Sequence, residues 1–290
     1  MTTPPAEARD LTDILAAVRL PQAWRFNRGE GATVAVVEAE GGHAGMVASI
    51  LAAGAPGCRI VPLAPPGDPA GLTAEGTLAV LEQLAALARE QGRPVIANFS
   101  WEVGRENLAL PCSDLVAGTV RRLSQERLVL TCWAAGNAGQ APSAQALAGF
   151  CCTNATPWSI SVGALDRRLR PQPYSAALGR CSPLHPTVAA PTYGLVPYGG
   201  GGDGYEDLGE EGGGTSACVP LASAALAIML TQWPGRPFGD YRAALRGSAH
   251  PQGRLLQADP AVASVPLAKA HPSWLLENLV LTPLSGFRAR

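Results

Sequence analysis

Short apolar runs alternate with amphipathic stretches along the chain, and this alternation predicts the secondary structure. Continuous apolar runs bounded by Gly, Pro or polar residues are typical of buried strands. They lie at residues 33–38, 58–63, 94–100, 128–133, 158–163 and 186–190. Apolar residues at helical spacing predict helices at residues 14–20, 44–53, 73–91, 114–125, 216–230 and 238–246. Asp13 is the expected N-cap of the first helix.

Strands that alternate with helices at this spacing predict an α/β fold. The expected architecture is a doubly wound, mostly parallel sheet with helices on both faces. The chain has 290 residues, of which 47% are hydrophobic and 16% charged, so it can bury a large core. The domain organisation that we expect has a tail and short helix at residues 1–19, one domain at 20–265, and an extension at 266–290.

Five polar residues stand where strands end or helices begin. Glu38, Ser100 and Asn137 follow predicted strands, whereas His43 and Ser216 open predicted helices. In open α/β sheets the site lies beyond the carboxyl ends of the strands. We therefore expect these five side chains to converge on one edge of the sheet.

This set of residues contains the parts needed for acyl transfer to a serine. Ser216 follows a Gly-rich turn and is the candidate nucleophile, with its backbone N–H as one oxyanion donor. Asn137 is the second candidate donor, His43 the candidate base, and Glu38 the carboxylate that orients the base. Two alternatives stay open here. Glu40 could serve in place of Glu38, and a hydroxyl residue of the Gly-rich turn, Thr215 or Ser216, could merely cap a buried helix.

Five motifs in unbroken order resemble those of the subtilases, the subtilisin-type serine peptidases, over residues 20–265. The motifs are Val34-Ala35-Val36-Val37-Glu38, His43-Ala44-Gly45-Met46-Val47-Ala48, Ile96-Ala97-Asn98-Phe99-Ser100, Ala134-Ala135-Gly136-Asn137 and Gly214-Thr215-Ser216-Ala217 with Pro220. The acid, histidine and serine also follow one another in the subtilisin order. The resemblance implies a subtilisin-like fold and peptide-bond cleavage through an acyl-enzyme.

The resemblance also implies which residues line the substrate pocket. They are Ser100, Trp101, Ala134, Ala135 and Gly136, which by resemblance flank the pocket for the residue before the cleaved bond.

The sequence departs from the family pattern at the acid. The family's acid is aspartate where this chain has a glutamate, and only four residues separate that glutamate from the histidine. The loop that commonly holds calcium in secreted members is missing, so we expect no metal site and no cofactor.

Composition limits the kinds of partner and the cellular compartment that we expect. A formal net charge of −1 gives no reason to expect nucleic acid or an anionic membrane as a partner. The sequence analysis predicts neither a signal peptide nor a membrane span. Seven scattered cysteines without metal spacing are typical of reduced, mostly buried thiols, Cys218 among them, and favour a cytoplasmic protein. His185, His250 and His271 precede prolines and are interpreted as surface loop residues.

The leading functional hypothesis is an intracellular serine endopeptidase that performs limited processing of a peptide or protein. One alternative is a peptide-binding module that has lost turnover, and another is a ligase or cyclase that uses the same acyl-enzyme. The acidic, Gly-rich insertion between Gly199 and Gly214 is either a solvated loop or a lid over the cleft. The sequence leaves the oligomeric state open.

Overall fold

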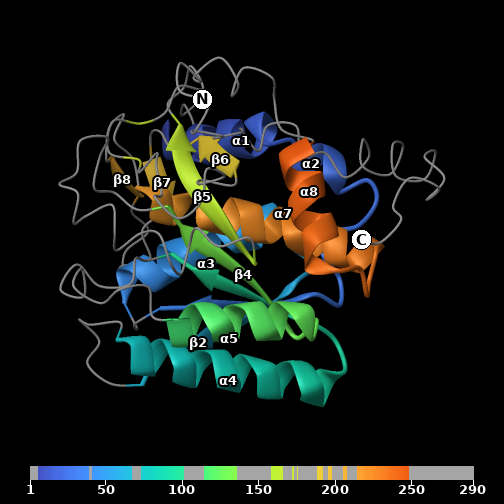
Figure 1. Cartoon of the computed structure of the whole chain (residues 1–290). Helices are drawn as coiled ribbons and strands as arrows, with labels where there is room; N and C mark the ends of the chain where they lie inside the picture. The colour runs from blue at the N-terminus through green and yellow to red at the C-terminus, as the bar shows by residue number, and fades with distance from the viewer. Residues whose placement is uncertain are drawn as a thin grey trace, which may run out of the picture.

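A six-stranded sheet between two layers of helices forms the centre of the molecule (Figure 1). The computed structural model describes residues 6–38, 41–66, 73–100, 114–135, 158–165, 172, 175, 188–191, 195–197, 205–207 and 214–247. The strands are all parallel and lie in the order β2-β1-β3-β4-β5-β6. The predicted α/β class, with a doubly wound parallel sheet, is confirmed.

The strands are the apolar runs seen in the sequence. They are β1 Thr33–Val37, β2 Arg59–Leu63, β3 Val95–Phe99, β4 Val129–Ala134, β5 Ser159–Leu165 and β6 Val188–Pro191. Every residue of β1, β3, β4 and β5 is buried, as expected for strands covered on both faces. The edge strand β2 is partly exposed. Because β2 and β3 flank β1 on opposite sides, the strand order reverses beside β1, and such a switch point is where α/β folds place their sites.

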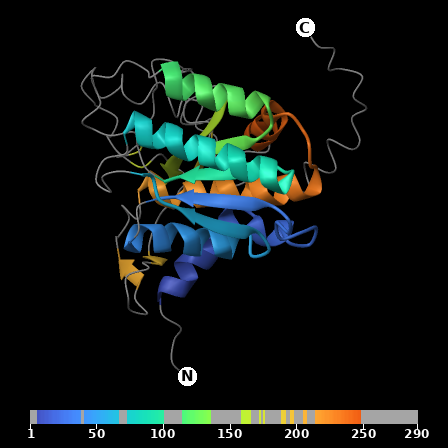
Figure 2. The ribbon, with the colours of Figure 1, turned by 90° about the horizontal axis from the view of Figure 1, so that it is seen from below.

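Successive residues of β1 contribute side chains to two separate hydrophobic cores, because side chains point alternately to the two faces of a strand. Val34 and Val36 belong to the cluster under α3 (Gly42–Gly54) and α7 (Val219–Gln232). Ala35 and Val37 belong to the cluster under α4 (Ala74–Gln91) and α5 (Asp114–Gln125). Figure 2 shows the two helical layers on opposite sides of the sheet. The layer of α3 and α7 also contains α1 (Ala6–Ala17), α2 (Leu20–Ala23) and α8 (Phe238–Gly247).

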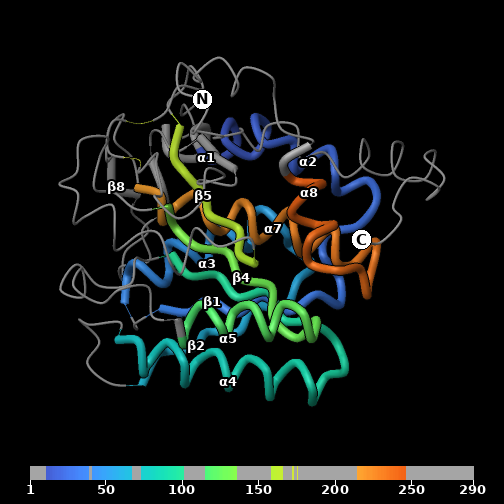
Figure 3. The backbone as a smooth tube through the Cα atoms, in the orientation of Figure 1, coloured from blue at the N-terminus to red at the C-terminus, as the bar shows by residue number. Residues whose placement is uncertain are grey.

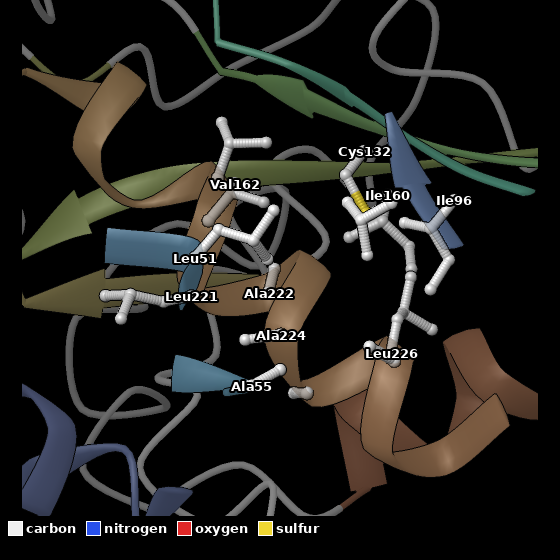
Figure 4. Close-up of a cluster of buried hydrophobic side chains, with 14 of the residues drawn as sticks. Leu51, Ala55, Ile96, Cys132, Ile160, Val162, Leu221, Ala222, Ala224 and Leu226 are labelled. Atoms are coloured by element: carbon white, nitrogen blue, oxygen red, sulfur yellow. The ribbon is translucent and has the colours of Figure 1, made fainter. Parts of the chain in front are cut away.

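Helix α7 runs through the middle of its layer, and the backbone trace in Figure 3 follows it from the sheet edge into the core. All residues from Val219 to Leu230 are buried, as in a helix that is apolar on every side. Figure 4 shows Leu221, Ala222 and Leu226 of this helix among Ile160 and Val162 of β5 and other core side chains. Among the described residues, the run Thr215–Gln232 is long and apolar enough for a membrane span, and 83% of it is buried inside the domain. Such burial is typical of the core helix of a globular domain.

Helices α3 and α7 approach closely because both present small residues at their contact. A Cβ atom added at Gly54 would lie 2.8 Å from the Cβ atom of Ala224, and 3.2 Å from a methyl group of Leu20. Gly54 therefore sets the separation of the helix that begins near His43 from the helix that begins near Ser216.

Two local predictions were wrong. Helix α1 begins at Ala6, so Asp13 lies inside the helix and does not cap it. Part of the acidic insertion, Tyr205–Asp207, forms strand β8, which pairs antiparallel with β7 (Leu195–Pro197). The insertion is therefore not simply a loop, because its backbone pairs with a neighbouring segment. The rest of the insertion and residues 248–290 lie outside the described residues.

Candidate active site

The switch point beside β1 brings two predicted site residues to one edge of the sheet. Glu38 directly follows β1 and Ser100 directly follows β3, and the register places Val36 opposite Asn98 in these parallel strands. The backbone N–H of Glu38 donates to the carbonyl oxygen of Leu63 at 3.2 Å, which continues the sheet ladder. The position of Glu38 is thus fixed by the sheet.

Glu38 and His43 form the central contact of the site. Nδ1 of His43, in the first turn of α3, lies 3.1 Å from Oε2 of Glu38. The Glu38 side chain is 8% exposed and the His43 side chain 46% exposed. The short connection between the two residues therefore allows the longer glutamate side chain to reach the imidazole ring. The structure assigns this contact to Glu38, while Glu40 lies outside the described residues.

The contact determines which ring nitrogen carries the proton. An ionised carboxylate only accepts hydrogen bonds, so Nδ1 of His43 donates and Nε2 remains able to take up a proton. The hydrogen bond to Glu38 raises the pKa of His43, against the opposing effect of burial. Oε1 of Glu38 is buried and has no hydrogen-bond partner among the described residues. Within this part of the chain, the imidazole N–H is thus the group that compensates the buried carboxylate.

The raised pKa of His43 makes the stability of the fold depend on pH. We expect the His43–Glu38 contact to contribute its full stabilisation below about pH 6.5, where the imidazole is charged in both the folded and the unfolded chain. The contribution is lost as pH rises through the higher pKa of the folded protein. Urea unfolding of the wild type and of His43→Gln should therefore differ most at low pH. A difference that stays constant up to pH ~9 would contradict this assignment.

Ser216 lies in a tight turn ahead of α7. The turn is a single 3-10 helix, η3 (Thr215–Ala217), and Gly214 before it has φ +65° and ψ −170°, a conformation that requires glycine. Ser216 is 9% exposed. Pro220 is the second residue of α7, where its missing N–H costs nothing. The N-cap positions of η3 and α7 are held by Gly214 and Cys218, so neither Thr215 nor Ser216 occupies the N-cap position of these two elements.

The base candidate and the nucleophile candidate come from neighbouring elements. Helix α3, which begins beside His43, packs against both η3 and α7. Although both residues are described, the structure records no hydrogen bond between the His43 ring and the Ser216 hydroxyl. Hydrogen bonds of this kind are often long in unliganded enzymes and tighten when substrate binds. The pairing of Ser216 with His43 therefore stays a prediction.

The structure describes only some of the remaining predicted site residues. Ser100 is fully buried, and its hydroxyl donates to the carbonyl oxygen of Ser216 at 2.9 Å. Any contact of Ser100 with a substrate would thus come from its backbone. Ala134 and Ala135 are buried at the end of β4, where the N–H of Ala135 donates to the carbonyl oxygen of Val162 at 2.9 Å. Trp101, Gly136 and Asn137 lie outside the described residues, so their roles stay predictions.

The sequence analysis missed two buried polar residues next to this site, Asn98 in β3 and Ser223 in α7. Each interrupts an apolar run, and that interruption was the available signal, because buried polar side chains need hydrogen-bond partners. Within the described ranges, no three His, Cys, Asp or Glu side chains are grouped so that they could hold a metal ion. Cys58, Cys132 and Cys218 form no disulfide, and burial raises the pKa of Cys58 to about 11 and that of Cys132 to about 12.

The fold is α/β, and one edge of its sheet holds the carboxylate of Glu38 against the imidazole of His43, with the Ser216 turn in a neighbouring element. The subtilase family model matches residues 13–264 of the sequence. The chain therefore belongs to the subtilase family of serine proteases. None of the curated proteins matches the sequence significantly.

Solved structures of subtilisin-like proteins share the fold. MycP1 from the ESX-1 type VII secretion system aligns with TM-score 0.66 and 18% identity over 96% of this chain and 87% of its own. The prenylagaramide maturation protease PagA aligns with TM-score 0.64 and 21% identity over 87% of this chain and 97% of its own. A cold-adapted subtilisin-like serine proteinase aligns with TM-score 0.58 and 17% identity over 83% and 89% of the two chains.

Proposed function

We propose that the protein is an endopeptidase that cleaves peptide bonds through an acyl-enzyme on Ser216. The observation that carries this proposal is the hydrogen bond between Nδ1 of His43 and Oε2 of Glu38. It leaves Nε2 of His43 as the basic nitrogen at the end of a helix that packs on the Ser216 turn.

In the proposed reaction, Oγ of Ser216 attacks the scissile carbonyl carbon while Nε2 of His43 takes up the hydroxyl proton. The buried carboxylate of Glu38 stabilises the imidazolium that forms. The backbone N–H of Ser216 and the side-chain amide of Asn137 donate to the oxyanion. His43 then returns the proton to the leaving amine, and a water molecule that His43 deprotonates releases the acyl group from Ser216.

The setting of the reaction is also part of the proposal. We infer that the enzyme acts in the cytoplasm on a narrow set of peptides or proteins. Cys58, Cys132 and Cys218 form no disulfide, which favours a reducing compartment. Limited processing is supported by the fold shared with PagA, a protein described as a maturation protease.

A second candidate is a peptide-binding module without turnover. It is favoured by the low exposure of Ser216 and by the missing hydrogen bond between this hydroxyl and His43 in the described structure. The two candidates differ in whether Ser216 reacts with an electrophile.

A fluorophosphonate probe tests the proposed endopeptidase, because it labels only serines that an adjacent base activates. We expect the wild type to be labelled and both Ser216→Ala and His43→Ala to lose labelling. Ser49→Ala is a matched control, since Ser49 is an exposed serine of α3 whose hydroxyl donates to the carbonyl oxygen of Gly45. It should keep full labelling. An unlabelled but folded wild type would favour the binding module, and peptide products that lack the added water would favour the ligase.

A further inference from the structure

A chain of buried hydrogen bonds links α7 to the backbone of Ser216 by way of β3. The hydroxyl of Ser223 donates to Oδ1 of Asn98 at 2.9 Å, and Nδ2 of Asn98 donates to Oγ of Ser100 at 2.8 Å. The Ser100 hydroxyl donates in turn to the carbonyl oxygen of Ser216 at 2.9 Å. We call these three side chains, Ser223, Asn98 and Ser100, the relay.

Each donor in the relay is determined by its neighbours. The carbonyl oxygen of Ser216 can only accept, so the single proton of Ser100 is directed at it. The Asn98 atom that faces Ser100 must therefore donate, which places Nδ2 there and turns Oδ1 toward Ser223. All three bonds consequently run in one direction, an arrangement in which each bond polarises and strengthens the next.

The relay lies in the protein interior and not on the surface of the site. Asn98, Ser100 and Ser223 each have 0% of their surface exposed. Because buried polar groups without partners are costly, each member fixes the orientation of the next.

The relay ends on the backbone of Ser216, the proposed nucleophile. Ser216 stands in a short 3-10 turn just after Gly214, which adopts a positive φ, so its local secondary structure is limited to one turn. The bond from Ser100 anchors the Ser216 carbonyl to the end of β3, beside the strand end that bears Glu38. Rotation of that carbonyl would move both the Ser216 side chain and the following N–H relative to the sheet edge.

We propose that Ser100, Asn98 and Ser223 are positioning residues that hold the Ser216 backbone in the orientation needed for attack. This proposal rests on the proposed function, since it concerns the reactivity of Ser216. The relay does not contact the reacting atoms, and its influence passes through the backbone of the nucleophile. Ser100 acts directly, Asn98 fixes the proton of Ser100, and Ser223 fixes the amide of Asn98.

The test measures labelling by the fluorophosphonate probe over a range of probe concentrations. This separates the maximal labelling rate from the concentration that gives half of it. We expect Ser100→Ala to lower the maximal rate by about tenfold to hundredfold, the effect of a small misplacement of a reacting group. The half-saturating concentration should change little. Asn98→Asp should have a similar effect, because a carboxylate facing Ser100 competes with Ser216 for its proton.

The order of the effects distinguishes positioning from general stability. Ser223→Ala removes an equally buried hydroxyl but leaves the bond from Ser100 to Ser216 in place, so its effect on the rate should be smaller. Thr77→Val is the matched control, since Thr77 is buried in α4 on the other face of the sheet and donates to the carbonyl oxygen of Thr73 at 2.9 Å. It should label at the wild-type rate even if its unfolding midpoint falls. All rates are compared on folded protein, as defined by urea unfolding.

The possible outcomes separate this proposal from the proposed function. If the wild type is labelled and folded Ser100→Ala and Asn98→Asp both keep the wild-type maximal rate, the positioning role alone is overturned. A folded wild type that is not labelled would overturn the proposed function as well. If Ser100→Ala does not fold, Asn98→Asp and Ser223→Ala carry the same test. Rates that decrease in the order wild type, Ser223→Ala and Asn98→Asp would then support the relay.

Discussion

Replacing Glu38 by glutamine is expected to lower kcat by about ten-thousandfold while the fold is retained. The glutamine side chain has nearly the same shape, but an NH2 group, which donates hydrogen bonds, replaces one of the two carboxylate oxygens, which accept them. The buried carboxylate that accepts the Nδ1–H of His43 would be lost, and with it both the tautomer that leaves Nε2 basic and the charge that stabilises the imidazolium. The measurement is peptide hydrolysis, with fluorophosphonate labelling as a second readout.

Glu82→Gln is the matched control for this substitution. Glu82 lies in α4 on the opposite face of the sheet, where its exposed carboxylate pairs with Arg122. We expect Glu82→Gln to turn over at the wild-type rate. A Glu38→Gln enzyme with nearly full kcat would mean that another group orients His43, and the assignment of the contact to function would be wrong.

The second large effect concerns the contact between α3 and α7. Gly54→Ala would place a Cβ atom 2.8 Å from that of Ala224, closer than two such atoms normally approach. The helices must then separate, and we expect a loss of about 2 kcal/mol in the free energy of unfolding, as for other overpacked cores. Because α3 begins beside His43 and α7 begins beside Ser216, the labelling rate should fall together with the stability.

A reciprocal substitution makes this prediction specific. Ala224→Gly removes the methyl group that the new side chain would meet, so Gly54→Ala combined with Ala224→Gly should be more stable than the sum of the single changes implies. We expect a favourable coupling energy of about 1 kcal/mol or more from urea unfolding of the four proteins. Additive effects would show that the two residues do not limit the approach of the helices. Gly92→Ala would not be a suitable comparison for Gly54→Ala. Gly92 has φ +64°, so any side chain at that position is strained whatever space surrounds it.

Much of the fold was predictable because its strands are buried on both faces. A short, continuous apolar run between polar or Gly-rich segments, such as the one at β1, is typical of a central parallel strand, and the helices between the strands keep a clear helical spacing. The start of α1 was missed because its first turn lacks an apolar stripe, and Asp13 resembles a capping residue by composition alone. Strand β8 was missed because acidic residues are unfavourable in strands, and backbone pairing with β7 outweighed that preference.

The candidate site was predictable as a set of residues but not as a set of contacts. The positions of Glu38, His43 and Ser216 follow from strand ends and helix starts. The sequence could not decide between Glu38 and Glu40, which depends on how a four-residue connection directs a side chain. It also placed Ser100 at a substrate pocket, whereas its hydroxyl is directed inward to Ser216, because direction at a strand end depends on three-dimensional packing.

The complete burial of α7 has a consequence for chains that are not yet fully folded. A helix that is buried on every side reaches its native packing only when both its own layer and the sheet have assembled around it. The Ser216 turn that precedes α7 therefore depends on this assembly, whereas Glu38 and His43 are close neighbours in the chain.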